Sequence, residues 1–279
     1  MSLPTPWAPL QVGWRHRALI FQLARREIEQ RYQGSMLGLL WAVLQPVMLL
    51  AVYTFVFGTI LEMRWTIADG TGNAVVHDVS TGRFALLLFS GLILFNIFGD
   101  CTTRAPNLLR EHAVFVTKIV FPVEILPWAT LVVALFNAAI ASTVLTAFHL
   151  VLFGLPAATA WLAPLVVIPT VCMVMGISWA LASIGLYLDD TRQAIGLVVT
   201  MTLFLSPVFY PLTIVPDPYR SLLYANPLTV GIESLRDVYF FGTLPDPIDF
   251  LFYLAAGWAV LWCGFAWFQR TKRGFADVL

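Results

Sequence analysis

The histidine and cysteine residues of this sequence are the groups most able to bind a metal or act as nucleophiles, so their spacing is informative. A zinc protease places two histidines four positions apart on one helix, and structural zinc sites use closely spaced cysteine pairs. Neither spacing occurs in this chain. We therefore expect no catalytic residue, no metal site and no disulfide framework. The residues are His16, His77, His112, His149, Cys101, Cys172 and Cys263.

Lysine is the next informative residue type, because phosphate-binding loops depend on it. A Walker A loop places lysine directly after glycine, so that its ammonium group reaches phosphates held by the loop backbone. In this chain Lys118 and Lys272 each follow threonine. The sequence therefore predicts no nucleotide site and no cofactor in the chain itself, and it does not indicate an enzyme.

Carboxylates inside an apolar run would indicate a proton or ion path through a membrane. Asp100 and Glu124 come closest, but both lie near the ends of such runs. Asp100 is four residues before Arg104, a spacing that permits a local ion pair, and Glu124 suits the positive dipole at a helix start. We interpret both carboxylates as structural, which disfavours a proton-driven transporter.

Aromatic side chains are the remaining groups with recognisable chemistry. They recur along two apolar stretches, one with Trp41 and Tyr53 and one with Phe209 and Tyr210. Aromatic faces stack on the apolar faces of sugar rings without demanding one hydrogen-bond pattern, so a passage lined with them would let a polymer slide. The alternative is that they are ordinary lipid-facing or interfacial aromatics. The same stretches also hold Phe55, Phe57 and Phe204.

The composition indicates which environment positions these side chains. Of the 279 residues, 59% are hydrophobic and 11% are charged. Soluble domains carry about 25% charged residues, and a soluble fold of this size could not bury so much apolar surface. We therefore expect an all-α integral membrane protein in contact with membrane lipids. The formal net charge of zero argues against a nucleic-acid partner.

Apolar runs free of charge predict six transmembrane helices. A spanning helix needs about 20 residues at roughly 1.5 Å each. Residues 125–188 contain no charged residue and are too long for one crossing, and the turn from Gly154 to Pro156 divides them in two. Pro207 and Pro211 lie near the end of the fifth run. The runs are residues 37–61, 84–99, the two halves of 125–188, 193–215 and 250–268.

Two further segments are rich in apolar residues but do not form spans. Before the first run, apolar residues recur at helical spacing from Leu19 to Tyr32, which predicts an amphipathic helix at the membrane interface. The alternative is a solvated helix beside the membrane. Residues 216–249, in the last external loop, carry many apolar side chains, so we expect short re-entrant helices there.

The distribution of basic residues predicts the orientation, because cytoplasmic connections carry an excess of Lys and Arg. Most of the 16 basic residues fall on the side that holds both termini, so both termini are expected in the cytoplasm. On that side are Arg15, Arg17, Arg25, Arg26, Arg31, Arg104, Arg110, Lys118, Arg192, Arg270, Lys272 and Arg273. On the external side are Arg64, Arg83, Arg220 and Arg236.

Four short motifs occur in order along most of the chain. The first is LARREIEQRYQGSMLGLLW, residues 23–41, which runs on to Gln45 and Pro46. The others are Phe121-Pro122 with Leu126-Pro127, SPVFYP at residues 206–211, and Asn226-Pro227 followed by Arg236. Together they resemble ABC-2 type polysaccharide-export permeases, the membrane subunits of capsular-polysaccharide, O-antigen and teichoic-acid ABC exporters. Many members have Arg-Asp after the fourth span, where this chain has Asp189-Asp190-Thr191-Arg192.

The resemblance implies a location and a set of partners. The subunit would form a homodimer in the bacterial inner membrane, with a translocation path at or near the dimer interface. Two copies of a separate ATPase, which bind ATP and Mg, would lie below it. The cargo would be a lipid-linked polysaccharide, and a periplasmic adaptor protein would be a further partner. The resemblance also favours the aromatic path, whose residues would be Trp41, Tyr53, Phe209 and Tyr210.

The resemblance also implies roles for two cytoplasmic elements. The interfacial helix would act as a gate or docking element at the cytoplasmic mouth, through Arg25, Arg26, Glu29 and Arg31. The loop of residues 107–118 would be the coupling helix that transmits ATPase motion. Its residues would be Leu109, Arg110, Glu111 and His112.

We interpret the chain as a single ABC-2 type transmembrane domain, residues 1–279. It divides into a cytoplasmic N-terminal segment (1–36), six spans (37–268) and a cytoplasmic tail (269–279). The expected function is that of a membrane permease subunit of an ATP-driven polysaccharide exporter. One alternative is an ABC-2 permease for drugs or lipids. Another is a membrane-embedded glycan-modifying enzyme, which would need a constellation of carboxylates or histidines.

Overall fold

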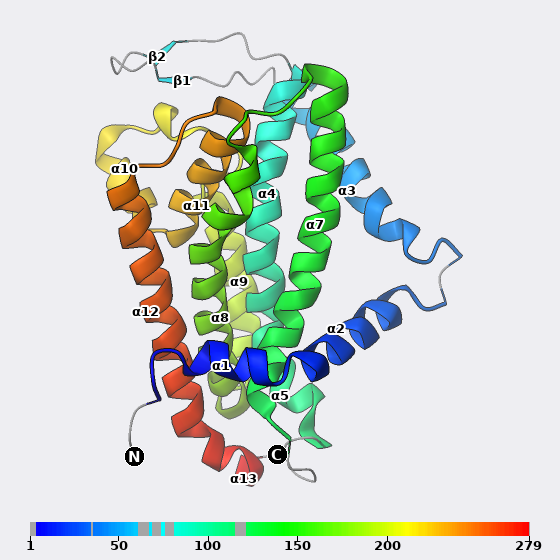
Figure 1. Ribbon diagram of the computed structural model, residues 1–279, viewed down its shortest axis with the longest axis vertical. Helices are drawn as coiled ribbons and strands as arrows, with labels where there is room; N and C mark the ends of the chain where they lie inside the picture. The colour runs from blue at the N-terminus through cyan, green and yellow to red at the C-terminus, as the bar shows by residue number, and fades with distance from the viewer. Residues whose placement is uncertain are drawn as a thin grey trace.

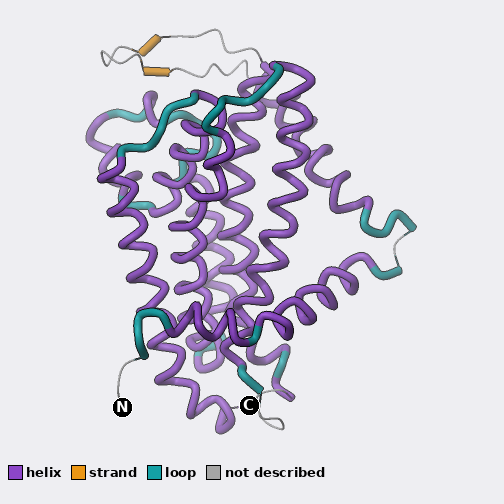
Figure 2. The backbone as a smooth tube through the Cα atoms, viewed as in Figure 1, coloured by secondary structure: helices purple, strands orange, loops and turns teal. Residues whose placement is uncertain are grey.

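A computed structural model describes residues 4–34, 36–60, 67–68, 74–75, 81–114 and 121–278. Long helices run side by side in one bundle, and the loops gather at its two ends (Figures 1 and 2). Both ends of the chain lie at one end of the bundle, which we call the terminal end. The short helices α10 and α11 lie toward the other, which we call the opposite end. Leu61, Arg64 and Lys118, which were part of the predictions, lie outside the described residues.

The described chain is almost entirely helical, as predicted. Two-residue strands β1 (Ile67–Ala68) and β2 (Ala74–Val75) pair antiparallel. Wider π-helical turns continue α3 over Thr54–Ile60 and α11 over Asp237–Phe241. The helices are α1 (Ala8–Arg15), α2 (Arg17–Tyr32), α3 (Leu40–Tyr53), α4 (Thr81–Arg104), α5 (Leu108–Glu111), α7 (Leu126–Phe153), α8 (Ala163–Tyr187), α9 (Thr191–Leu205), α10 (Asp217–Tyr224), α11 (Pro227–Arg236), α12 (Pro247–Thr271) and α13 (Phe275–Val278).

Within the described residues, 5 helical stretches are long and apolar enough to cross a membrane. The predicted break in residues 125–188 is confirmed, because α7 ends at Phe153 and Gly154 has a φ of 81°. The helix of the fifth predicted span is shorter than expected, since α9 has 15 residues and does not reach residue 215. The five stretches are Leu40–Ile60, Gly82–Glu111, Val123–Phe153, Ala160–Tyr187 and Pro247–Gly274.

Helix α4 lies at the centre of the core. Its side chains from Phe84 to Phe95 are all buried, because α4 contacts α7, α8, α9 and α11. A helix that is apolar on every side is stable only when it is buried on every side. Further along α4, the polar residues Asn96 and Asp100 are exposed, so this part of the helix is not enclosed by the core.

Helices α8 and α12 pack closely along their length. A Cβ atom added to Gly264 of α12 would collide with the carbonyl oxygen of Gly176 in α8. Lipid gives no hydrophobic drive for helices to associate, so membrane helices rely on close backbone approach at small residues. The two glycines therefore set the distance between these helices.

The predicted N-terminal helix is present as α2, and a further helix that was not predicted, α1, precedes it and meets it at His16. Helix α2 packs against α7 and buries Ile20 and Ala24, while Arg25 and Glu29 are exposed. From there α2 leads away from the bundle and α3 returns to it, so the two helices form a wedge beside α7 (Figure 1).

Candidate functional site

Aromatic rings from three segments pack together where α3 ends. Phe209, in the loop after α9, stacks on Phe57 of the π-helical turn with ring centroids 5.7 Å apart. Tyr53 meets the same Phe209 ring edge-on at 6.5 Å, and Phe204 lies 6.0 Å from it. Phe84 of α4 lies 6.4 Å from Phe57. We call these five residues the aromatic cluster.

The structure brings three of the four predicted path residues together. Tyr53 and Phe209 belong to the aromatic cluster, and the Tyr210 hydroxyl donates a hydrogen bond to the Phe204 carbonyl at 3.1 Å. Trp41 lies apart, 41% exposed near the start of α3. Tyr53 follows Trp41 by twelve positions along the helix, which corresponds to a rise of about 18 Å. Their role in a path stays a prediction.

The backbone leaves helical geometry at Ser206, and this places Phe209 in the cluster. Pro207 and Pro211 lack the N–H group that a helix needs, so α9 does not continue through them. Asn226 then holds the turn, since its Nδ2 donates to Ser206 Oγ at 2.8 Å. The same side chain caps α11 by accepting from the Leu228 N–H at 3.0 Å.

The guanidinium of Arg236 ties this turn to α4. Its Nη1 and Nη2 atoms donate to the carbonyls of Pro207 at 2.6 Å and Val208 at 2.9 Å. Its Nε donates to the Leu87 carbonyl of α4 at 3.1 Å, and Glu233 lies 2.8 Å from Nη1. The side chain is 1% exposed, a burial that a charge tolerates only when it is paired and hydrogen-bonded. Sequence reasoning noted Arg236 in a motif but missed this clamp, since its acceptors are backbone atoms.

Arg104, at the end of α4, joins the N-terminal helix α2 and the short helix α5, both of which the sequence singled out. Its guanidinium forms an ion pair with Glu27 of α2. It also lies 3.5 Å from Glu111 of α5. The sequence spacing permitted a local ion pair between Asp100 and Arg104, but in the structure the ion-pair partners of Arg104 come from α2 and α5. These side chains border a cavity of about 380 Å³ between α2, α4, α5 and α7.

The predicted coupling residues lie at the terminal end, around the turn between α8 and α9. Arg110 donates to the Leu186 carbonyl at 3.0 Å and lies 2.6 Å from Asp189. Hydrogen bonding from Arg192 and then the Arg110 charge hold the pKa of Asp189 below its usual range. Leu109 is fully buried within this chain, and His112 Nδ1 lies 3.0 Å from the Leu108 carbonyl. Glu111 is exposed.

The predicted gate residues lie on the exposed side of α2. Arg25 and Glu29 form an ion pair at 2.8 Å along one helix face, and Arg26 is also exposed. Water and salt screen exposed pairs of this kind, so the pair contributes little to stability by itself. Arg31 differs, because it borders a cavity shared with α3, α4 and α7.

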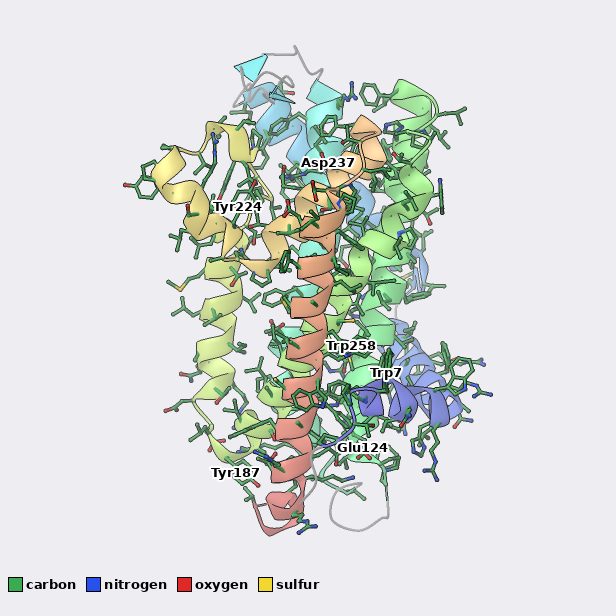
Figure 3. The ribbon with its side chains drawn as sticks, turned by 60° about the vertical axis from the view of Figure 1, so that its left-hand side comes forward. Trp7, Glu124, Tyr187, Tyr224, Asp237 and Trp258 are labelled. Carbon is green, nitrogen blue, oxygen red and sulfur yellow. The ribbon has the colours of Figure 1, made fainter. Side chains whose placement is uncertain are left out.

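Two further contacts attach both chain termini to the bundle (Figure 3). The rings of Trp7 and Trp258 lie 4.8 Å apart, which holds the start of α1 against α12. Lys272, after α12, pairs with Glu124 at 2.6 Å. Glu124 therefore has a specific cationic partner beyond the helix dipole that the sequence indicated.

Acidic side chains gather at the opposite end, where Figure 3 labels Tyr224 and Asp237. Asp237, Glu233, Asp246 and Asp249 border a cavity of about 480 Å³ with Tyr224. Burial raises the pKa of Asp237 to about 6, and the nearby Glu233 charge adds to this shift. Across the part of the chain that the structure describes, no three His, Cys, Asp or Glu side chains are grouped to hold a metal ion.

Comparison with known protein families shows which family the sequence matches. The profile of the family described as ABC-2 type transporter matches residues 18–240, from α2 to the π-helical turn after α11. The chain belongs to the ABC-2 type transporter family. The match covers α2, the aromatic cluster, the coupling residues and the Arg236 clamp in one continuous segment.

Among curated proteins, the relatives of this ABC-2 chain are export components. It is 26% identical to the O-antigen export system permease protein RfbA of Myxococcus xanthus, over 95% of this chain and 96% of that protein. A protein of the same name from Klebsiella pneumoniae is 24% identical over 94% of this chain and 95% of its own length. The polysialic acid transport protein KpsM of Escherichia coli is 23% identical over 89% and 91%. The resemblance inferred from the four sequence motifs is confirmed.

Proposed function

We propose that this chain is the membrane permease subunit of an ATP-driven exporter that moves a lipid-linked polysaccharide across the inner membrane. The observation that carries this proposal is similarity over nearly the full length to proteins named for O-antigen export and polysialic acid transport. Both named cargoes are polysaccharides, which supports this function over export of drugs or lipids.

The proposed assembly contains two copies of this subunit and two copies of a separate ATPase, which binds ATP and Mg. A periplasmic adaptor protein is a further proposed partner. Support comes from family membership and from the lack of a Gly-Lys phosphate loop in the sequence. In this division of labour the chain itself catalyses no reaction, and its role is to carry and gate the path.

The proposed topology has six crossings with both termini in the cytoplasm. The fifth crossing along the chain is α9 together with residues 206–211, because the 15 helical residues span only about 22 Å of a core of about 30 Å. Helices α10 and α11 are proposed to be re-entrant. Their 8 and 10 residues are too few to span, and α11 is largely buried against α4 and α8.

The proposed path passes Trp41 on the cytoplasmic side and the aromatic cluster with Tyr210 on the outer side. Ring faces at both levels would stack on successive sugars. The ion pairs of Arg104 support a mechanism for coupling: motion imposed by the ATPase on α5 would act on α2 through Glu111, Arg104 and Glu27.

The test is deletion of the gene in its source strain, followed by measurement of surface polysaccharide. We expect the surface polysaccharide to disappear and lipid-linked glycan to accumulate inside the cell, and plasmid-borne wild-type chain to restore both. The matched control is a strain with a hydrolysis-deficient partner ATPase, which should show the same accumulation. Unchanged surface polysaccharide in the deletion strain would contradict the proposed function.

A further inference from the structure

Polar side chains from four helices meet in a cavity of about 230 Å³ in the wedge between α2, α3, α4 and α7. About 10–15 Å³ of such space holds one water molecule, so this cavity accommodates a much larger ligand. The side chains relevant to its chemistry are Arg31, Gln45, Phe89, Asn96, Asp100 and Asn137. We call this the polar cavity.

The polar groups are arranged around one carboxylate. The Asn137 amide of α7 and the Arg31 guanidinium of α2 line the same cavity as the Asp100 carboxylate of α4. Asn96 lies one turn before Asp100 on the same helix face, and both are exposed. On α3, Pro46 has no N–H to donate to the Ala42 carbonyl, and both residues line the cavity.

The depth of these groups makes their presence informative. Asp100 lies four residues, or about 6 Å, from the end of α4. Asn137 lies eleven residues, or about 16 Å, from the start of α7. Lipid cannot hydrogen-bond to an amide at the depth of Asn137, so a polar residue there faces protein, water or a ligand and indicates function.

The composition of the cavity selects one class of ligand. Arg31 and Asp100 bring one positive and one negative charge, so the cavity has no excess charge to attract a phosphate or a cation. Amide side chains both donate and accept, which matches neighbouring hydroxyl groups that do the same. Phe89 lines the wall but is only 3% exposed, so it adds apolar wall and no ring face for stacking.

We propose that the polar cavity binds a neutral, hydroxyl-rich sugar unit, with Asn96, Asp100 and Asn137 as hydrogen-bonding groups. This inference rests on the proposed function, because it takes the ligand to be part of the exported glycan. It adds a second kind of sugar contact, polar and in the terminal half of the bundle, to the stacking contacts of the aromatic cluster. Such a site would hold a sugar between movements, while the aromatic rings allow it to slide.

The experiment measures binding of methyl glycosides to the complex of this chain with its ATPase in lipid nanodiscs. Saturation-transfer NMR is recorded with the methyl glycosides of glucose, mannose and galactose, and with glycerol phosphate as an anionic probe. We expect a signal for at least one glycoside and a fall of roughly fivefold or more in Asn137→Leu and in Asn96→Leu. Thr143→Val, an exposed position on α7 outside the cavity, is the matched control and should keep the signal.

Stability is measured in parallel, and Asn137→Gln, which keeps the amide, should retain part of the signal. No glycoside signal in the wild type, an equal signal in the cavity variants, or binding of glycerol phosphate alone would each overturn the proposal. Measurement of surface polysaccharide then distinguishes failure of the proposed sugar site from failure of the proposed function. Normal export with Asn137→Leu, in a strain where deletion abolishes export, would reject the site and leave the proposed function standing.

Discussion

Arg236 and Asp237 are neighbours in the chain, yet their charges meet opposite surroundings. The Arg236 guanidinium donates to three backbone carbonyls and pairs with Glu233. The carboxylate of Asp237 is largely removed from water beside the same Glu233, which raises its pKa to about 6. The protein thus stabilises the positive charge of Arg236 and destabilises the negative charge of Asp237, the next residue.

Replacement of Asp237 should therefore change how stability depends on pH. The folded-state pKa is raised above the ordinary value of 3.8, so the folded state binds more protons between these values. The contribution of protonated Asp237 to the stability of the folded protein is therefore fully present below about pH 4, and it is lost as the pH rises to about 6. We expect Asp237→Asn to raise the melting temperature at about pH 7.5 by roughly 2–4 °C and to flatten its pH dependence. Asp249→Asn, an exposed position nearby, is the control, and an equal effect there would contradict the assignment.

The aromatic side chains should separate into two groups. Phe209 touches three rings of the cluster, so we expect Phe209→Ala to lower both thermal stability and surface polysaccharide. Full burial of such a ring is worth about 3–5 kcal/mol, and a half-buried one correspondingly less. Trp41→Ala should lower surface polysaccharide with little change in melting temperature, because Trp41 is exposed. Phe252→Ala, an exposed ring on α12, is the control; equal export in all three variants would reject an aromatic path.

Among the elements, α4 connects the two ends of the molecule. Near the opposite end of the bundle, α4 is held to the 206–211 turn through Arg236. At the terminal end, its final residue, Arg104, contacts α2 and α5. A buried, apolar helix of this kind moves as a rigid body, because packed cores do not deform continuously. Motion at α5 can therefore reach α2 without crossing a flexible segment.

Loss of the Arg104 contacts should separate ATP hydrolysis from export. We expect Glu27→Gln and Arg104→Gln to reduce surface polysaccharide severalfold, while the purified complex still hydrolyses ATP. Exchange of the charges, Glu27→Arg with Arg104→Glu, should recover part of the export. Arg17→Gln, at an exposed position at the start of the same helix and outside the predicted gate residues, is the control and should be nearly silent. Full export by Arg104→Gln at normal expression would exclude Arg104 from coupling.

The contact between α8 and α12 can be tested with two glycines. Gly264→Ala places a methyl group against the Gly176 carbonyl, so we expect a loss of about 1–3 kcal/mol and a lower yield of folded protein. Gly196→Ala in α9 meets no atom within 4 Å and should be neutral or stabilising by up to about 1 kcal/mol. Thermal melts of the two variants in one detergent provide the comparison. Similar melting temperatures would show that the helices have room to adjust.

At the scale of the whole molecule, the bundle is polarised. Both chain termini lie at the terminal end, where ion pairs join α2, α4, α5, the turn before α7 and the tail after α12. The opposite end holds the acidic cavity and the turn fixed by Arg236. Each end thus has its own polar network, separated by the apolar core around α4.

This polarity yields a topology experiment. In a background with the three native cysteines changed to alanine, a membrane-impermeant maleimide is applied to intact spheroplasts. We expect Tyr219→Cys, on α10, to be labelled and Arg273→Cys, after α12, to be labelled only after lysis. The reverse pattern would invert the orientation inferred from the basic residues. The native cysteines to be removed are Cys101, Cys172 and Cys263.

Local signals in the sequence predicted much of the fold. Charge-free runs located the long helices, and Gly154 marked the end of α7 because its positive φ suits glycine. The end of α9 at Leu205 was missed, although Pro207 and Pro211 were a signal for it. These prolines were read as lying inside a span, but the turn is completed by Asn226 and Arg236 from a later segment.

The candidate site was less predictable than the fold. Tyr53 and Phe209 were identified by residue type alone, yet Phe57, which contacts both, was not among the predicted path residues. The polar cavity draws residues from four helices, and each of them alone resembles an isolated polar residue in an otherwise apolar stretch. Only packing places Asn137 beside Asp100, and no local spacing encodes that approach.

The clamp around Arg236 also bears on how the chain is synthesised. Translation proceeds from the N-terminus, so Leu87, Pro207 and Val208 leave the ribosome before Arg236 does. The carbonyl groups that the guanidinium needs are already present when it first meets the membrane, and Glu233 lies only three residues before it. Insertion of this segment therefore never requires an unpaired guanidinium to wait in lipid for a partner still to be made, and α12 can close the bundle last.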